Sequence, residues 1–342
     1  MLIYRTVIIM RSIIAFIAVL LAACILQFPE PGNASVALKD CETCHVLYPG
    51  MMGKEKGKDK SKDKITKDAM CVNCHTNTAE DTIKILGSFR TPIVYNTQEP
   101  NKPLAGGNFY YVAHMGERKG HNVNNISYSD MKFGGLPPGY ERTLDPSSIG
   151  YNEHKPLACA GSNGCHGDRN IEDPFAAIMG SHHAIDTPVD GTTIAKSYRF
   201  LKITSISKGV VGLEDPDWGQ NSSPTEHNEY SPSIIRLCES CHGEFHGKDK
   251  SKVWFRHPVG VVLPDRGEYK SYTAYSPEAP VARPDVPNLP GKEVKPGRDV
   301  VVCLTCHMAH GSPYNSSLRW NFETMIAGRR GKSGCFICHS KK

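Results

Sequence analysis

The chain has 342 residues, 39% of them hydrophobic, and its 31 glycines and 24 prolines stand among few segments with a regular apolar period. This composition excludes a core of long helices or long strands and favours short elements joined by loops. The 40 basic and 35 acidic residues leave a formal net charge of +5, and the 13 cysteines are the most informative feature.

The first 37 residues have the three parts of a secretory signal. Arg5 and Arg11 form a basic region, residues 13–26 are uncharged and apolar, and Ser35-Val-Ala37 is a small-residue cleavage site. The apolar stretch is shorter than the about 18 residues that a membrane span needs. We therefore expect residues 1–37 to be removed as a signal peptide and residues 38–342 to form a single domain. Alternatively, Cys24 follows a lipobox-like Leu-Ala-Ala and would carry a lipid anchor.

Five Cys-x-x-Cys-His motifs recur along the chain, which is the attachment pattern of c-type haem. Two thiols about one helical turn apart can add to the two vinyl groups of one porphyrin, while the adjacent histidine binds its iron. Zinc sites or redox dithiols are the alternative, but zinc ribbons place their second cysteine pair about 15–20 residues on, a spacing absent here. The motifs are Cys41, Cys44 and His45; Cys71, Cys74 and His75; Cys238, Cys241 and His242; Cys303, Cys306 and His307; and Cys335, Cys338 and His339.

A sixth attachment site is expected at Cys159, Cys165 and His166. The spacer between these cysteines has five residues, and Gly161 and Gly164 give it the freedom to fold back and bring the thiols together. A disulfide between Cys159 and Cys165 is the alternative in an exported chain, but it leaves His166 without a role. The sequence therefore predicts six haem c groups.

Six haem groups leave about 51 residues of protein for each, too few for a conventional core around every cofactor. We expect a mostly irregular fold with a few short helices, organised around a chain of stacked haems, whose folding depends on haem attachment. The expected helices are residues 171–179 and segments beside the motifs, and the proline-rich residues 263–300 are expected to form an extended strap or a subunit contact.

Nine histidines lie outside the motifs, more than the six needed to give every iron a second histidine. His182 and His183 are adjacent and can diverge toward two irons, and His310 follows His307 by one short turn. His227 and His246 are weaker candidates, and methionine ligation is unnecessary by this count. The candidate distal ligands are His114, His121, His154, His182, His183, His257 and His310.

Several segments resemble the multihaem c-type cytochromes that carry doubled CXXCH elements. They are Gly-His-Asn-Val at 120–123, Arg-His-Pro-Val-Gly at 256–260, Cys-Leu-Thr-Cys-His-Met-Ala-His-Gly at 303–311 and Cys-Phe-Ile-Cys-His at 335–339. In size and sparse secondary structure the chain is similar to the extracellular cytochromes of metal-reducing bacteria and archaea, including filament-forming ones. The resemblance implies that His257 and His310 are distal ligands. The spacer after Cys159 departs from the family's standard motif.

Electron transport is the function that these features favour, because irons with two histidine ligands have no open position for a substrate. A reductase of nitrite or sulfite is the enzyme alternative, but no Cys-x-x-Cys-Lys motif marks an open iron. A structural, polymer-forming role overlaps with electron transport, and a monomeric periplasmic shuttle is a further alternative. We expect an electron-transfer protein rather than an enzyme.

The expected partners are other cytochromes or redox proteins, further copies in a homo-polymer and an extracellular electron acceptor. Export places the protein outside the cell or at its surface, with the periplasm as the alternative. Loss of Arg5, Arg11 and Glu30 with the signal lowers the net charge from +5 to +4, and six ferric haem groups of about −1 each bring it to about −2. Nucleic acid binding has no support.

Overall fold

The computed structural model describes residues 67–87, 89–127, 136–140, 155–183, 189–203, 208–243, 257–329 and 331–341. The chain divides into the units Met1–Lys56 and Gly57–Lys342, and every described residue belongs to the second. The expected signal segment, the motif at Cys41, Cys44 and His45, and the candidate ligand His154 lie outside the described residues. Within the described part, no helix is both long and apolar enough to cross a membrane.

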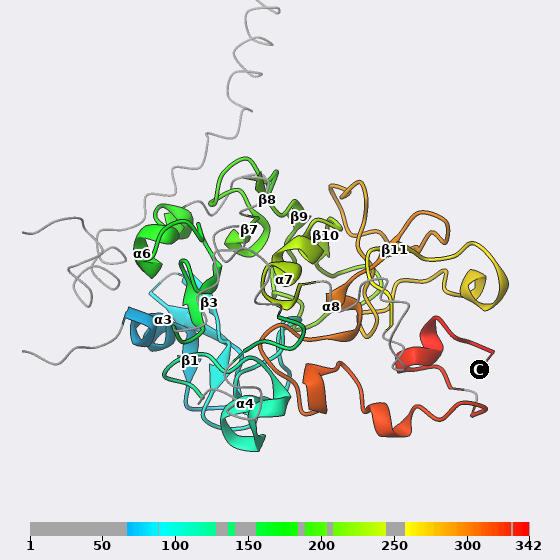
Figure 1. The fold of residues 1–342 in the computed structure, drawn as a ribbon, viewed down its shortest axis with the longest axis horizontal. Helices are drawn as coiled ribbons and strands as arrows, with labels where there is room; N and C mark the ends of the chain where they lie inside the picture. Colours follow the sequence, from blue (N-terminus) through cyan, green and yellow to red (C-terminus); the bar gives the residue numbers. More distant parts are fainter. Residues whose placement is uncertain are drawn as a thin grey trace, which may run out of the picture. The chain divides into compact units, whose positions relative to one another are not determined.

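Short elements joined by loops make up the described chain (Figure 1), which confirms the expected irregular fold with few short helices. The longest described helices have nine residues and the longest strands four. In the first half, the elements are α3 (Lys67–His75), β1 (Thr76–Asn77), β2 (Ile83–Leu86), β3 (Phe89–Pro92), β4 (Tyr95–Asn96), α4 (Tyr110–Met115), η2 (Glu117–Lys119), β5 (Ala158–Ala160), β6 (Gly164–His166), α6 (Pro174–Ala177) and η4 (Ser181–His183).

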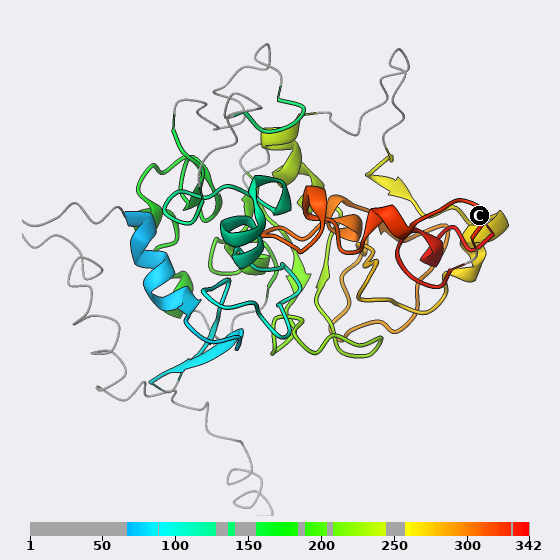
Figure 2. The same cartoon turned by 90° about the horizontal axis from the view of Figure 1, so that it is seen from below.

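The second half continues in the same way. It contains η5 (Tyr198–Phe200), β7 (Lys202–Ile203), β8 (Lys208–Gly209), β9 (Gly212–Leu213), β10 (Glu229–Tyr230), α7 (Ile234–His242), β11 (Val261–Val262), η7 (Gly267–Ser271), β12 (Val300–Val301), α8 (Cys303–Cys306), η8 (Asn315–Ser317), η9 (Phe322–Thr324) and η10 (Gly334–Ile337). Each sheet in the described part is a single pair of strands. The hairpin of β2 and β3, cyan beside the blue helix α3 in Figure 2, pairs Ile83 with Pro92 and Leu86 with Phe89.

The helix expected over residues 171–179 is shorter than the sequence suggested. Only Pro174–Ala177 is helical, because Asp173 forms the N-cap and accepts hydrogen bonds from the backbone N–H groups of Phe175 (3.0 Å) and Ala176 (3.3 Å). Asn170, which directly precedes the expected helix, instead donates its backbone N–H to Asp168 at 2.9 Å. A proline directly after a capping aspartate favours the start of a helix. The helix therefore begins at Pro174 and not at residue 171.

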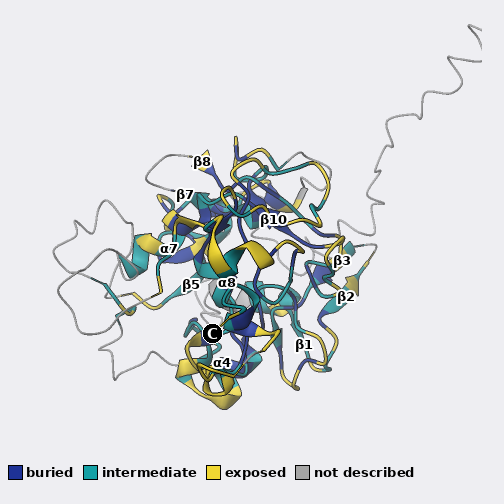
Figure 3. Cartoon of the chain, turned by 90° about the vertical axis from the view of Figure 1, so that its right-hand side faces the viewer, coloured by how far each residue is buried: buried dark blue, intermediate teal, exposed yellow. Residues whose placement is uncertain are grey.

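Buried apolar side chains form small clusters rather than one continuous layer, and the dark-blue buried stretches of Figure 3 lie around β7 and β10. One cluster joins Ile203, Val210, Ile234 and Val302. Another lies under the strap and includes Leu263, Tyr272, Val281 and Val294. Such clusters bury little area each, so polar contacts and bound groups must hold the segments between them.

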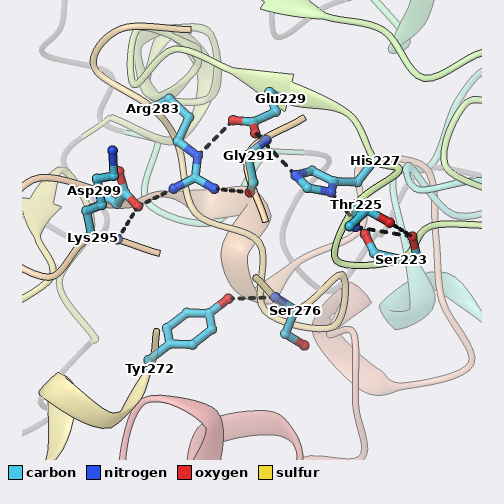
Figure 4. A network of polar contacts seen from close by, with 10 residues as sticks. All are labelled: Ser223, Thr225, His227, Glu229, Tyr272, Ser276, Arg283, Gly291, Lys295 and Asp299. Carbon is cyan, nitrogen blue, oxygen red and sulfur yellow. Dashed lines mark hydrogen bonds and ion pairs between the residues drawn. The ribbon is translucent and has the colours of Figure 1, made fainter. Parts of the chain in front are cut away.

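The proline-rich strap of residues 263–300 is fixed to the rest of the chain by a buried charge network centred on Arg283 (Figure 4). Its guanidinium donates to Glu229 of β10 at 2.8 Å, to Asp299 and to the carbonyl of Gly291 at 2.9 Å. The side chains of Arg283, Glu229 and Asp299 are only 6%, 0% and 3% exposed. The network is thus a dry clamp between the strap and β10.

Glu229 remains ionised inside this clamp. Burial by itself would raise the pKa of its carboxyl, but hydrogen bonds from His227 and the Gly291 N–H, together with the Arg283 charge, hold the pKa below its ordinary value. His227 lies with Nε2 3.2 Å from Glu229 and with Nδ1 3.0 Å from the carbonyl of Ser223, and its ring stacks on Tyr275 at 3.5 Å. Both of its nitrogen atoms are therefore engaged.

Replacing Arg283 with Met should destabilise the haem-loaded protein by about 3–5 kcal/mol, because two buried carboxylates then lose their counter-charge. Guanidinium unfolding followed by near-ultraviolet circular dichroism measures this. Arg298→Met is the control, since Arg298 pairs with Asp285 through side chains that are 53% and 80% exposed, and such pairs contribute about 0–1 kcal/mol. Equal effects of the two substitutions would contradict the clamp.

Candidate functional site: paired histidines beside the cysteine motifs

The described Cys-x-x-Cys-His motifs lie at the ends of short helices. Both nine-residue helices, α3 and α7, finish at the motif histidine, His75 and His242. The thiols of the last two motifs sit on α8 and in and just after η10. One helical turn separates the paired thiols in each case, so both can reach the same edge of a planar group while the histidine lies just beyond the helix.

The expected sixth site folds back on itself as its glycines allow. Strands β5 and β6 pair in parallel, with Ala158 opposite Gly164 and Ala160 opposite His166. Gly161 has a φ of +87°, and a Cβ atom there would lie 2.8 Å from the carbonyl oxygen of Glu172. Cys159 and Cys165, which flank this turn, do not form a disulfide with each other. The five-residue spacer therefore brings the two cysteines onto neighbouring strands.

Each of four motif histidines faces a histidine from a distant part of the chain. The ring centres of two imidazoles that bind opposite sides of one metal ion, at metal–nitrogen distances of about 2.0 Å, are about 6 Å apart. The four observed separations all match this value, so the residues fit an iron held between two histidines. The pairs are His75 and His182 at 6.3 Å, His121 and His242 at 6.0 Å, His166 and His310 at 6.4 Å, and His257 and His339 at 6.1 Å.

Hydrogen bonds indicate which nitrogen of these rings carries the hydrogen. Nδ1 of His75 lies 2.8 Å from the carbonyl of Pro92, and Nδ1 of His121 lies 2.6 Å from that of Ala309. A carbonyl can only accept, so Nδ1 carries the hydrogen and Nε2 keeps its lone pair for a metal. The same arrangement holds for His166 with Arg199, His242 with Pro138, His257 with Pro258 and His307 with Ser316, at 2.7–3.0 Å.

A neutral imidazole is the form that binds iron. Burial, the largest influence, lowers the pKa of His75 and His166 below the ordinary value, and it lowers that of His310 to about 3. These three rings are therefore unprotonated near neutral pH.

Close backbone approaches between glycines place His121 and His310. A Cβ atom at Gly120 would lie 2.2 Å from the carbonyl oxygen of His310, and one at Gly107 would lie 2.0 Å from that of Gly311. The contact is held by hydrogen bonds from the backbone N–H of His121 to His310 (3.2 Å) and from that of His310 to Gly106 (2.8 Å). Only glycine permits this approach, so the Gly-His and His-Gly pairs in the sequence serve to position the two rings.

Thiols of different motifs also lie near one another. Cys238 and Cys303 are in hydrogen-bonding contact, which raises the pKa of Cys238 and lowers that of Cys303. Burial and then the nearby Cys335 raise the pKa of Cys306 to about 12. At the third motif, Cys165 lies in the electrostatic range of Cys241. Successive motifs from Cys159 to Cys338 thus follow one another in space as they do in sequence.

The structure separates the candidate distal histidines. His121, His182, His257 and His310 each face a motif histidine, whereas His114 is exposed and stacks on Tyr110 at 4.6 Å. The side chain of His183 and all of His154 lie outside the described residues. His227, a weaker candidate, belongs to the buried clamp.

Other residues of the site carry no signal in the sequence. The carbonyl acceptors of the motif histidines, such as Pro92 at the end of β3 and Ser316 in η8, belong to no recognisable sequence motif. Arg169 is 3% exposed and its guanidinium lies 3.6 Å from the sulfur of Cys241. Glu268 bonds to His339. Their roles follow from long-range folding, which motif spacing does not report.

Comparison with known proteins supports haem c as the group that such motifs hold. A family model described as the doubled CXXCH motif matches residues 294–342. C-type cytochrome OmcS of Geobacter sulfurreducens is 23% identical over 381 aligned residues, which cover 87% of this chain and 83% of that protein. The matched motif and this similarity are those of a multihaem c-type cytochrome. Among solved structures, the cytochrome is similar to the Outer Membrane Cytochrome S Filament from Geobacter sulfurreducens, with 18% identity, 75% of each chain covered and a TM-score of 0.45.

His121 and His114, seven residues apart, give a matched test of the paired geometry. His121→Ala should leave one iron with an open axial position, giving one high-spin haem per chain and carbon monoxide binding at one site after reduction. His114→Ala should leave the protein fully low-spin, because this ring stacks on Tyr110 and faces no described motif histidine. Absorption spectra and carbon monoxide titration of both variants measure the difference. A high-spin haem in His114→Ala but not in His121→Ala would reverse the two assignments.

Proposed function

We propose that this cytochrome carries electrons along a row of haem groups and is not an enzyme. The four histidine pairs are the observation that carries the proposal, since a histidine on each side fills both axial positions of an iron. Haem c supplies one-electron oxidation and reduction, and the chain anchors, orients and shields it. A nitrite- or sulfite-type reductase needs an open iron, and the sequence has no Cys-x-x-Cys-Lys motif to provide one.

Six haem groups would be bound within the proposed domain of residues 38–342. The thioether anchors are Cys41 and Cys44, Cys71 and Cys74, Cys159 and Cys165, Cys238 and Cys241, Cys303 and Cys306, and Cys335 and Cys338, with His45, His75, His166, His242, His307 and His339 as proximal ligands. His182, His310, His121 and His257 would be the distal ligands of His75, His166, His242 and His339. We assign His154 and His183 to His45 and His307, since His114 stacks on Tyr110 and faces no described motif histidine.

Contacts between motifs support transfer from one haem group to the next. The thiol contact of Cys238 with Cys303 and the nearness of Cys306 to Cys335 would bring consecutive porphyrin edges together. His310 lies in the electrostatic range of both His166 and His121, which belong to different pairs. These contacts support a continuous chain rather than separate redox centres.

The expected export signal supports a function outside the cytoplasm. The proposed signal at residues 1–37 has a basic region, an apolar stretch and a cleavage site. The cytochrome would then act outside the cell or at its surface, exchanging electrons with redox partners and an extracellular acceptor. A lipid-anchored periplasmic shuttle, held through Cys24, is the alternative location.

Assembly into a head-to-tail homo-polymer would extend the chain of haem groups beyond one subunit. A haem row that reaches the ends of a small subunit leaves porphyrin edges there, and contact with the next copy covers them. A heterologous contact of this kind builds a filament whenever its rotation does not close a ring. The sequence resemblance to filament-forming cytochromes supports the same assembly.

Intact mass spectrometry of the mature cytochrome should show six covalent haem groups. Changing both Cys159 and Cys165 to Ala should remove one, because these thiols form the only bonds of that site to its porphyrin. A double Cys→Ala change at Cys71 and Cys74 should remove one in the same way and serves as the reference. Five haem groups and a disulfide in the unmodified protein would contradict the six-site assignment.

Electron micrographs of material sheared from cells that produce the cytochrome should show filaments whose mass spectrum matches residues 38–342. We expect the filaments to conduct and to show only low-spin haem spectra, as a chain of two-histidine irons requires. Monodisperse monomers at high concentration would favour the shuttle. Stoichiometric high-spin haem with turnover of nitrite or sulfite would overturn electron transport as the function.

A further inference from the structure

The histidine of the last motif differs from the other described motif histidines in what its second nitrogen contacts. Nδ1 of His339 lies 3.1 Å from a carboxylate oxygen of Glu268. The others face uncharged backbone carbonyls: His75 that of Pro92, His166 that of Arg199, His242 that of Pro138 and His307 that of Ser316. One proximal ligand in the described part of the chain is therefore bound to a negative charge.

Glu268 is held in place by its own surroundings. It lies in the first turn of η7, and its second carboxylate oxygen accepts the backbone N–H of Lys341 at 3.0 Å. Its carbonyl accepts from the hydroxyl of Ser271 at 2.6 Å, and that hydroxyl lies 2.7 Å from the hydroxyl of Ser340. These bonds tie η7 to the residues directly after His339. The carboxylate is thus positioned by the motif that it contacts.

The pair is largely withdrawn from water. The side chains of Glu268 and His339 are 11% and 19% exposed. In such surroundings the charge is screened less than at the surface, so its field at the ligand is strong. The neighbouring Lys270 lies 3.4 Å from Asp265 instead, in a pair whose side chains are 61% and 62% exposed.

A carboxylate that accepts the Nδ1 hydrogen of a ligating histidine makes the ring a stronger electron donor to the metal. This favours ferric iron, which carries one more positive charge than ferrous iron, and so lowers the reduction potential. We propose that Glu268 makes the haem group held by His339 the one with the lowest reduction potential among the described histidine pairs; this inference rests on the proposed electron-carrying function. Glu268 acts as a positioning residue through His339.

The functional consequence is a preferred direction of electron transfer at the C-terminal end of the haem chain. An electron that reaches the His339 haem group reduces ferric to ferrous iron, and it leaves downhill when the next haem group accepts it. The last motif therefore serves as a point of entry rather than a place where electrons collect.

Ring orientation provides a way to observe this haem group separately. The imidazole planes of His257 and His339 are 79° apart, whereas those of the other pairs are 33°, 59° and 42° apart. Iron between nearly perpendicular imidazoles gives a strongly anisotropic low-spin signal in electron paramagnetic resonance. The ferric His339 haem group should therefore show the most anisotropic signal of the four.

The test is a redox titration of the full mature haem-loaded cytochrome, reduced by dithionite with mediator dyes and followed by electron paramagnetic resonance. In the unmodified protein, the most anisotropic signal should be the last to disappear on reduction. Glu268→Gln should favour reduction of that haem group by about tenfold, which is about 59 mV for one electron. Asp265→Asn, which removes an exposed charge three residues away, should leave its potential unchanged.

Two results would overturn the proposal: the most anisotropic signal disappearing first in the unmodified protein, or Glu268→Gln shifting no more than Asp265→Asn. The first measurement needs no variant, so it holds even where Glu268→Gln fails to load haem. High-spin signals in the unmodified protein would instead count against the electron-carrying function itself. The results therefore distinguish failure of the Glu268 proposal from failure of the electron-carrying function.

Discussion

The facing of two histidines from distant segments, at the separation that an iron between them would require, is the constraint on which the rest of this structure depends. His166 and His310, or His75 and His182, lie far apart in the sequence, and each pair closes a long loop. The iron coordination that we propose for these pairs would restrict the chain as a metal site or disulfide does, and it would be made only in the folded state. The short helices and two-stranded sheets between the pairs are too small to specify the fold by themselves.

Other protein contacts fix the segments between the histidine pairs. Glycine contacts between residues 106–107, 120 and 311 hold His121 and His310 in position. The buried Arg283 clamp does the same for the strap, where few apolar side chains are available. Both devices are local, so each haem environment can have its own polarity and its own hydrogen bonds. The contrast between Pro92 and Glu268 as histidine acceptors is one result.

The sequence predicted the irregular fold and the attachment motifs because these depend on short-range patterns such as Cys-x-x-Cys-His. It also identified His257 and His310 as candidates through neighbouring residues. It did not predict which motif each spare histidine would face, since that depends on long-range folding. His114 and His121 are nearly equivalent in sequence, yet one is exposed on Tyr110 and the other faces His242. The helix predicted over residues 171–179 was too long, because the prediction did not take the N-cap at Asp173 into account.

The contact between Cys238 and Cys303 has a consequence for biogenesis. In an oxidising compartment, two neighbouring thiols can be oxidised to a disulfide, which here would block both attachment sites. The chain must therefore receive its porphyrins while these segments are still apart, or be kept reduced until it does. Maturation then has a required order, in which covalent modification comes before tertiary structure. A chain that folded first would be trapped by its own cysteines.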